Sequence, residues 1–304
     1  MLSLGRRPAA PPDGRPRLAA ITMVRNESAM LPRWVRHYSE QCSGPESLVV
    51  IDDRSTDGST DGLPCPVIRT PSFIHRQFEP ARLGMVSHIA SGLLEAYDMV
   101  VFTDADEFLV ADPDRYGSLR DLVAAKPENR VFGAMGLNVV HHVGHEPPLD
   151  PDRPILAQRR LAKFIPLMCK PAIKNVHGQW TAASHGLRHT PWTIDPDLYM
   201  FHAKFADRDA LREAAEHRLA GVQLEGRPRT TSWKFGGDTM VSLLDKVTQK
   251  ADLGALATFE PTPELLAGIV CEEEDTFRAR GGRQVPAMKK AELVLVPERF
   301  RHIV

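Results

Sequence analysis

The stretch VVFTDADEFLV, residues 100–110, leads from a run of apolar residues into three acids and then back into apolar residues. On an extended backbone, Asp104 and Asp106 are two positions apart, so their carboxylates point to the same face. Two carboxylates on one face repel each other unless a positive charge lies between them. The stretch therefore predicts a buried strand whose end holds a cation, or carboxylates that pair with buried arginines.

Strand-like and helix-like segments alternate upstream of this stretch. Apolar residues at i, i+3, i+4 and i+7 predict an amphipathic helix over 31–38, which Asn26 or Ser28 could cap, and a second helix over 83–97. Strands are predicted at 17–24, 47–53, 66–70 and 99–104. Strands that alternate with helices indicate βαβ units, and so an α/β fold with a mainly parallel, Rossmann-like sheet flanked by helices.

The second half of the chain has a mixed pattern. Residues 131–140 and 154–160 have the apolar pattern of strands. Helices are expected over 207–219, where Asp207 can cap, and over 241–247 and 263–280. The chain thus divides into a disordered Pro/Arg-rich tail (1–16), an α/β domain (17–205) and a helical C-terminal region (206–304) that packs on or covers the functional site.

The bulk composition excludes several classes of protein. The chain has 304 residues, 42% of them hydrophobic, and a net charge of −1, which argues against a nucleic-acid-binding surface. Its four cysteines form no C-x-x-C pair, so neither a zinc site nor a disulfide framework is expected. No apolar run reaches the roughly 18 residues of a transmembrane segment. We expect a cytoplasmic protein, with peripheral attachment at the inner face of the membrane as the alternative.

Two acidic clusters follow directly after predicted strands. The second strand runs into Asp52 and Asp53, and the fourth runs into Asp104 and Asp106. In open parallel sheets, ligands bind beyond the carboxyl ends of the strands, so both clusters are expected at a ligand site. The segment after Asp53 also has the spacing of a calcium loop. However, Pro64 stands where a bidentate Glu is required, so we interpret it as a turn rich in Asp, Ser and Gly.

Three motifs follow one another along the chain: MVRNE (23–27), VVIDDRSTDGS (49–59) and DADEF (104–108). With Trp34 and the HY pair at 37–38, they resemble the nucleotide-sugar glycosyltransferases of family 2, in the branch with an N-terminal RNE and a DxDEF motif. The resemblance covers about residues 18–205. It implies the GT-A fold and a hexosyltransferase-like enzyme that moves a sugar from a nucleoside-diphosphate sugar to an acceptor hydroxyl, with inversion. The acceptor would be a glycan, a lipid-linked molecule or a small molecule.

The resemblance also implies roles for residues around the donor. Asp52 or Asp53 would hold the nucleotide base or ribose, as the acid after the second strand does in that family. Arg25, beside the end of the first strand, would line the same pocket. Arg82, just before the second helix, would contact the base or a phosphate.

Asp104 and Asp106 would form the metal-binding DxD motif of the family. Independently of the resemblance, two carboxylates supply the hard oxygen ligands that suit Mn²⁺ or Mg²⁺, completed by phosphate oxygens and water. Such an ion neutralises charge on the departing nucleoside diphosphate. In GT-A enzymes a C-terminal His often adds a ligand, and His202 stands at that place, although Ala203 follows where the family often has Tyr. A core histidine is the alternative.

An inverting transfer needs a general base that takes the proton of the acceptor hydroxyl. The candidates are Asp195 and His185, with Asp238 as a third, and Asp195 could instead belong to a turn. We favour Asp195, because carboxylates are the usual base in the family that this chain resembles. Glu107 is expected to be a structural carboxylate, oriented by an arginine. The histidines between 141 and 145 are expected in a solvated loop.

Other classes of protein share parts of this pattern. A hydrolase of the haloacid-dehalogenase class also places a D-x-D motif at a strand end, but there the motif opens the domain, whereas here two strands precede it. A nucleotidyltransferase would carry a Gly-rich phosphate loop after its first strand, and MVRNESA (23–29) has no glycine. The alternative that we retain is a non-catalytic nucleotide-sugar-binding protein on the same fold.

Overall fold

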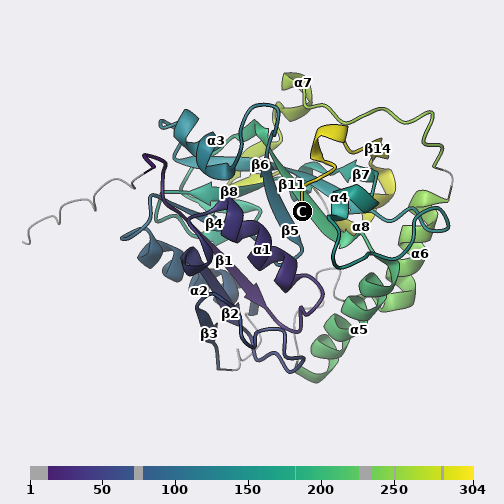
Figure 1. The fold of residues 1–304 in the computed structure, drawn as a ribbon, viewed down its shortest axis with the longest axis horizontal. Coiled ribbons are helices and arrows are strands. Elements are labelled where there is room, and N and C mark those ends of the chain that lie inside the picture. The colour runs from purple at the N-terminus through teal and green to yellow at the C-terminus, as the bar shows by residue number, and fades with distance from the viewer. Residues whose placement is uncertain (1–12, 72–77, 182, 226–233, 250, 282–283) are drawn as a thin grey trace, which may run out of the picture.

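The computed structural model describes residues 13–71, 78–181, 183–225, 234–249, 251–281 and 284–304 (Figure 1). The strands of its large sheet are β1 (Leu18–Val24), β2 (Leu48–Asp52), β3 (Val67–Arg69), β4 (Met99–Phe102), β5 (Glu107–Ala111), β6 (Val131–Val140), β7 (Leu161–Phe164), β8 (Lys170–Lys174), β11 (Ile194–Phe205) and β14 (Val294–Leu295). A smaller sheet contains β9 (Trp180–Thr181), β10 (Gly186–Arg188), β12 (Val270–Glu273) and β13 (Thr276–Ala279). The helices are α1 (Leu31–Gln41), α2 (Phe78–Leu93), α3 (Leu119–Ala125), α4 (Ile155–Gln158), α5 (Arg208–Glu225), α6 (Gly237–Thr248), α7 (Pro263–Leu266) and α8 (Gln284–Lys290), with the 3-10 turns η1 (Pro45–Ser47), η2 (Pro166–Met168) and η4 (Glu298–Phe300).

The N-terminal half of the large sheet is parallel and is covered on both faces. In it, β3, β2, β1 and β4 pair side by side in parallel. Successive residues of β1 point to opposite faces, so Ala20 packs in one core cluster with Trp34 of α1, whereas Ile21 packs in another with Val86 of α2. A helix on each face explains why every residue of β1 is buried. The α/β class predicted from the sequence is confirmed.

Beyond β4 the sheet becomes mixed. β8 runs antiparallel to β4 and β6, and β7 runs antiparallel to β6. The 12-residue strand β11 pairs in parallel with β6 and antiparallel with β5, which begins directly after the acid pair. Because a strand rises roughly 3.3 Å per residue, β11 carries different side chains to two well-separated ends of the sheet.

Two predictions for residues 140–160 are wrong. The strand expected at 154–160 is the short helix α4 followed by β7, because the fixed φ of Pro154 favours the start of a helical turn. The second prediction, a solvated loop, is wrong for His141 and His142, which are each 5% exposed, whereas His145 is exposed as predicted. His141 is held inward by a 2.9 Å hydrogen bond between its Nε2 and the carbonyl of Glu146.

The C-terminal region is helical only in part. The first two expected helices are present as α5 and α6, which lie side by side (Figure 1), and Asp207 caps α5 by accepting from backbone N–H groups two and three residues on. The prediction of a helix over 263–280 is wrong, because α7 ends at Leu266 and β12 and β13 then form a hairpin. Gly268 and Glu274 have φ values of 67° and 55°, a left-handed backbone that no helix interior accepts.

Most of the predicted N-terminal tail, residues 1–12, lies outside the described residues. The prediction of disorder is wrong for the end of the tail at 13–16, because two ion pairs hold it against α3. Arg120 lies 2.9 Å from Asp13, and Arg15 lies 3.4 Å from Asp121. None of the helices in the described ranges is long and apolar enough to cross a membrane.

Candidate active site

The acid pair lies between β4 and β5, at the carboxyl end of the parallel strands, and its two carboxylates have different partners. Arg82 Nη1 lies 2.9 Å from Asp104 Oδ1, and Arg82 itself is held by Glu79 at 2.7 Å. His202 Nε2 lies 3.4 Å from Asp106 Oδ2. Burial raises the pKa of Asp104, but the surrounding charges, first that of Arg82, hold it below its usual value. Burial likewise raises the pKa of Asp106, and His202, Arg218 and Lys204 together more than reverse the effect.

His202 is positioned by β11 between β5 and β6. Its Nδ1 lies 2.9 Å from Oδ1 of Asn138 on β6. An amide oxygen only accepts hydrogen bonds, so Nδ1 carries a proton and a neutral His202 turns the lone pair of Nε2 toward Asp106. A lone pair that faces a carboxylate is favourable only when a proton or a metal ion lies between them. No group of three or more His, Cys, Asp or Glu in the described ranges is arranged to hold a metal.

Glu107 holds the turn that carries the acid pair, and its partner is a lysine, not the expected arginine. Lys170 Nζ lies 2.6 Å from Glu107 Oε2, and the two side chains are 1% and 2% exposed. The same oxygen accepts a 2.8 Å hydrogen bond from the N–H of Asp104. Lys170 also donates to the hydroxyl of Ser184 at 2.9 Å. Burial raises the pKa of Glu107, and the charge of Lys170 opposes this rise.

Three charged residues outside the predicted site complete the cluster. Arg218 of α5 places Nη2 3.8 Å from Glu27 Oε1 and 4.0 Å from Asp106 Oδ2. Burial raises the pKa of Glu27 to about 7, which Arg218 opposes and Asp106 reinforces. Lys204 follows His202 by two residues on the same face of β11, and burial and the charge of Arg218 lower its pKa to about 7. Glu27 belongs to the RNE motif, so it could have been predicted, whereas only the packing of α5 brings in Arg218.

The two acids after β2 differ in their surroundings. Asp52 is fully buried, and both its oxygens are bonded within the protein. Its Oδ1 accepts from the N–H of Ser55 at 2.7 Å, and its Oδ2 accepts from Arg69 Nε at 2.8 Å. Asp53 places Oδ2 4.0 Å from Arg25 Nη1. Asp52 therefore holds the turn, and Asp53 is the acid that lies beside Arg25.

The loops after β1 and β2 hold each other. Asn26 and Arg54 have φ values of 54° and 60°, which is uncommon for residues other than glycine and concentrates at binding sites. Oδ1 of Asn26 accepts from the N–H of Thr56 at 2.8 Å, and the N–H of Ser28 donates to Asp57 at 3.1 Å. The prediction that Asn26 or Ser28 caps α1 is wrong, since the helix has no side-chain cap.

Asp195, the favoured base, is not brought to the acid pair. Lys126 Nζ lies 2.7 Å from Asp195 and 2.9 Å from Asp197, near the start of β11. Seven residues separate Asp195 from His202, which corresponds to about 23 Å of strand. This position is inconsistent with proton transfer at the acid pair, because β11 carries Asp195 to its opposite end.

His185 lies in the turn before β10, next to Ser184, whose hydroxyl accepts from Lys170, the partner of Glu107. Burial and the charge of Lys170 lower the pKa of His185 to about 3, and Asp104 acts on the same ring. His185 is therefore one residue away from the hydrogen bonds that connect Ser184, Lys170 and Glu107. The third candidate, Asp238, is 89% exposed at the start of α6 and pairs with Arg212 of α5.

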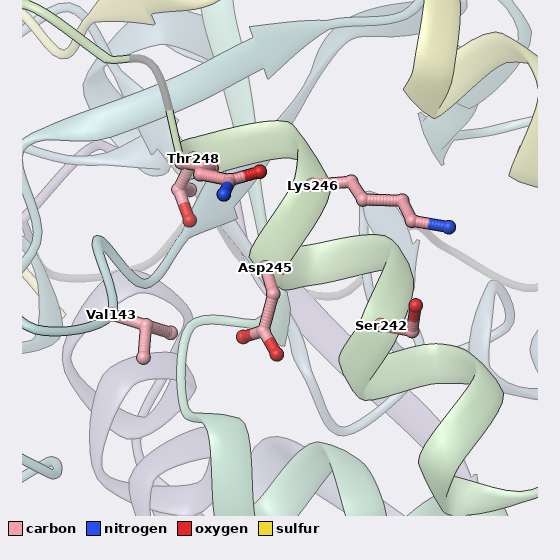
Figure 2. A pocket seen from close by; sticks show the side chains of 6 residues that line it. Val143, Ser242, Asp245, Lys246 and Thr248 are labelled. Atoms are coloured by element: carbon pink, nitrogen blue, oxygen red, sulfur yellow. The ribbon is translucent and has the colours of Figure 1, made fainter.

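A separate depression of about 320 Å³ lies between the loop after β6 and α6 (Figure 2). It is lined by Val143, Ser242, Asp245, Lys246, Thr248 and Gln249. Asp245 is engaged by Arg208 at 3.4 Å, and Thr248 donates to a helix carbonyl at 3.1 Å. None of the residues predicted for the site lines this depression, and we assign it no ligand.

No family model and no curated protein matches this chain. A mannosyltransferase from Pyrobaculum calidifontis, solved with GDP-Man and Mn²⁺, is similar over 52% of this chain and 44% of its own, at 21% identity and a TM-score of 0.28. S. aureus TarS (1–349) is similar over 67% of this chain and 65% of its own, at 13% identity and a TM-score of 0.28. This chain spans less than half the length of the mannosyltransferase. At these TM-scores the likeness carries no argument about function.

Proposed function

We propose that this protein transfers a sugar from a nucleoside-diphosphate sugar to an acceptor hydroxyl, with inversion and with the help of a divalent cation. The observation that carries the proposal is the pair of Asp106 Oδ2 and His202 Nε2, 3.4 Å apart, at the carboxyl end of the parallel strands. Ligands of open α/β sheets bind at that edge. The RNE and DxDEF motifs also meet there, since Arg218 lies within 4.0 Å of both Glu27 and Asp106.

Asp106 and His202 would hold the cation, because Asn138 keeps the ring proton on the other nitrogen of His202. One carboxylate oxygen and one imidazole nitrogen suit Mn²⁺ better than Mg²⁺, which is bound mainly by oxygen ligands. A bound cation neutralises the charge that develops on the departing nucleoside diphosphate. Asp104, engaged by Arg82 at 2.9 Å, would contact the donor and not share the metal.

The nucleotide would bind where the loops after β1 and β2 hold each other. Asp53 lies beside Arg25, so its carboxylate would accept hydrogen bonds from the ribose or the base. Asp52 is engaged by Ser55 and Arg69 and would shape the turn instead. A nucleotide base and a diphosphate would then span the distance from the end of β2 to the end of β4.

Of the candidate bases, we assign the proton of the acceptor hydroxyl to His185, because it follows Ser184, which is connected through Lys170 to Glu107. Its Nδ1 is buried and has no hydrogen-bond partner among the described residues. A pKa lowered to about 3 keeps His185 neutral at pH 7, with a ring nitrogen able to accept a proton. A bound diphosphate would raise the pKa of the ring toward neutrality, where a general base works best.

Thermal unfolding with UDP-sugars and GDP-sugars tests the proposal, with Mn²⁺ and again with excess EDTA. A ligand at 100 times its Kd stabilises a folded protein by about 2.7 kcal/mol. We expect one nucleotide class to raise the Tm in Mn²⁺ and to lose most of this effect in EDTA, which should also abolish transfer. If no nucleotide sugar stabilises the protein, the proposal is overturned. Stabilisation without hydrolysis or transfer to any acceptor would favour the non-catalytic binding protein.

A further inference from the structure

The inner face of α5 carries an arginine where an apolar residue is expected. Leu211 and Ala215, 2% and 5% exposed, pack the first turns of α5 into the core. Residues at i, i+4 and i+7 lie on one face of a helix, so Arg218 continues this buried stripe. The Arg218 side chain is 23% exposed, whereas that of Arg212 is 43% exposed. The helix therefore directs Arg218 toward the sheet and leaves Arg212 nearer to solvent.

Arg218 reaches the acid pair but makes no hydrogen bond there. Its Nη2 lies 3.8 Å from Glu27 and 4.0 Å from Asp106, and both distances exceed a hydrogen bond. No closer acceptor for this guanidinium occurs among the described residues. A guanidinium has five N–H donors in a planar fork, so Arg218 keeps donors for a further anionic group.

Lys204 adds a second cation on the same side. It extends from the face of β11 that also carries His202. Its Nζ lies 3.2 Å from Oε1 of Gln284. Lys204 and Arg218 thus form a positive edge along the acid pair, contributed by β11 and α5.

We propose that Arg218, with Lys204 beside it, binds the diphosphate of the donor, so that the C-terminal region supplies part of the donor site. The inference rests on the proposed function and adds the residue that recognises the second phosphate. Paired N–H groups of a guanidinium match two oxygens of one phosphate. Arg218 also lies within 4.0 Å of Asp106, the residue proposed to hold the cation that accompanies a diphosphate.

The test is calorimetric titration of UDP and GDP, each beside its monophosphate, in Mn²⁺, with wild type, Arg218→Ala, Arg218→Lys and the control Arg212→Ala. We expect Arg218→Ala to weaken binding of the diphosphate that wild type prefers by about tenfold to a hundredfold. Binding of the matching monophosphate should change by less than about twofold, because it lacks the second phosphate. Arg218→Lys keeps the charge without the fork and should recover part of the loss. Arg212→Ala should bind both nucleotides as wild type does.

Two results would overturn this inference alone, given that wild type binds a diphosphate. One is an unchanged diphosphate affinity in Arg218→Ala. The other is an equal loss for diphosphate and monophosphate, which would show that α5 only supports the site. Thermal unfolding of Arg218→Ala at the wild-type Tm shows that the variant is folded. A wild type that binds neither diphosphate would instead overturn the proposed function, and this inference with it.

Discussion

Carboxylates lie at both ends of β11, on the strand itself at one end and on the turn before β5 at the other, and the protein neutralises them in different ways. At one end, Lys126 Nζ lies 2.7 Å from Asp195 and 2.9 Å from Asp197. The N–H of Asp197 also donates to Asp195 at 2.9 Å, so these carboxylates are closely surrounded by donors. At the other end, His202 and Arg218 approach Asp106 only to 3.4 Å and 4.0 Å.

The difference shows that burial alone does not identify a binding carboxylate. The side chains of Asp195 and Asp106 are 5% and 14% exposed, so both lie inside the protein. A carboxylate whose lone pairs are already used by close donors holds the fold and has little left for a ligand. A carboxylate with several cations at longer range keeps its coordination capacity, which is the arrangement found at functional sites.

Replacing the acid at each end should give the largest effect. Asp106→Ala should lower transfer by at least about a hundredfold, because it removes a proposed metal ligand. It should lower the free energy of unfolding less than Asp195→Ala does, because the partners of Asp106 lie at 3.4 Å and 4.0 Å and Asp104 loses a like-charged neighbour. Asp195→Ala should lower the free energy of unfolding by about 3 kcal/mol, because it leaves the partly buried Lys126 without a main partner.

Urea unfolding and a transfer assay on both variants measure these effects. A large loss of stability in Asp106→Ala would assign that residue to the fold. A loss of transfer in Asp195→Ala at wild-type stability and nucleotide affinity would return the base to Asp195. Either result would show that Asp195 and Asp106 do not have the separate structural and ligand-binding roles proposed for them.

Asp52 and Asp53, after β2, show the same contrast between a carboxylate that holds the fold and one that binds a ligand. The expected effects of replacing them are smaller. Asp53→Ala should weaken nucleoside-diphosphate binding by about tenfold to a hundredfold, the equivalent of one charge-assisted hydrogen bond. Asp52→Ala should instead lower the free energy of unfolding by about 1–3 kcal/mol, because Ser55 and Arg69 lose their acceptor. Calorimetric titration and urea unfolding of both variants separate the two roles. Equal losses of nucleotide affinity would show that the two acids act as one unit.

A pH-dependent effect is expected at His37 of α1, which contacts the strand next to β11. Its Nε2 donates to the carbonyl of Leu109 at 2.8 Å, and Leu109 pairs with Met200 of β11. Burial lowers the pKa of His37 to about 4, against the opposing effect of that hydrogen bond. The unfolded pKa is about 6.5, so between these values the unfolded state binds more protons and stability falls as the pH falls. Below about pH 4 the free energy of unfolding should be about 3 kcal/mol lower than at neutral pH, and above about pH 7 His37 should cause no loss.

Urea unfolding at pH 7, 5.5 and 4.5 measures this dependence. His37→Gln keeps an N–H donor without the titration, so its stability should fall less steeply with acid than that of wild type. His302→Gln, at an exposed histidine near the C-terminus, should retain the wild-type slope. An unchanged slope in His37→Gln would place the acid sensitivity elsewhere.

The sequence by itself determined the parallel half of the sheet and the ends of its strands. Helical and strand periodicities are local, and they placed α1 and β1 to β4 close to their observed bounds, but α2 about one helical turn too late in the chain. Local patterning also put Asp53 and Asp106 just beyond buried strands, at the edge where such sheets bind ligands. It failed at 263–280, where two residues with positive φ override a helical pattern.

Only the tertiary structure decided which charges surround those acids. His202 meets Asn138 across 64 positions of sequence, and Lys170 meets Glu107 across 63. Side chains alternate across a strand, so the register of β11 on β5 and β6 determines which of its acids and bases face the acid pair. That register sends His202 to the acid pair and Asp195 to Lys126, and the packing of α5 adds Arg218. Register and packing depend on the burial of whole faces of the sheet, and no short stretch of sequence contains that information.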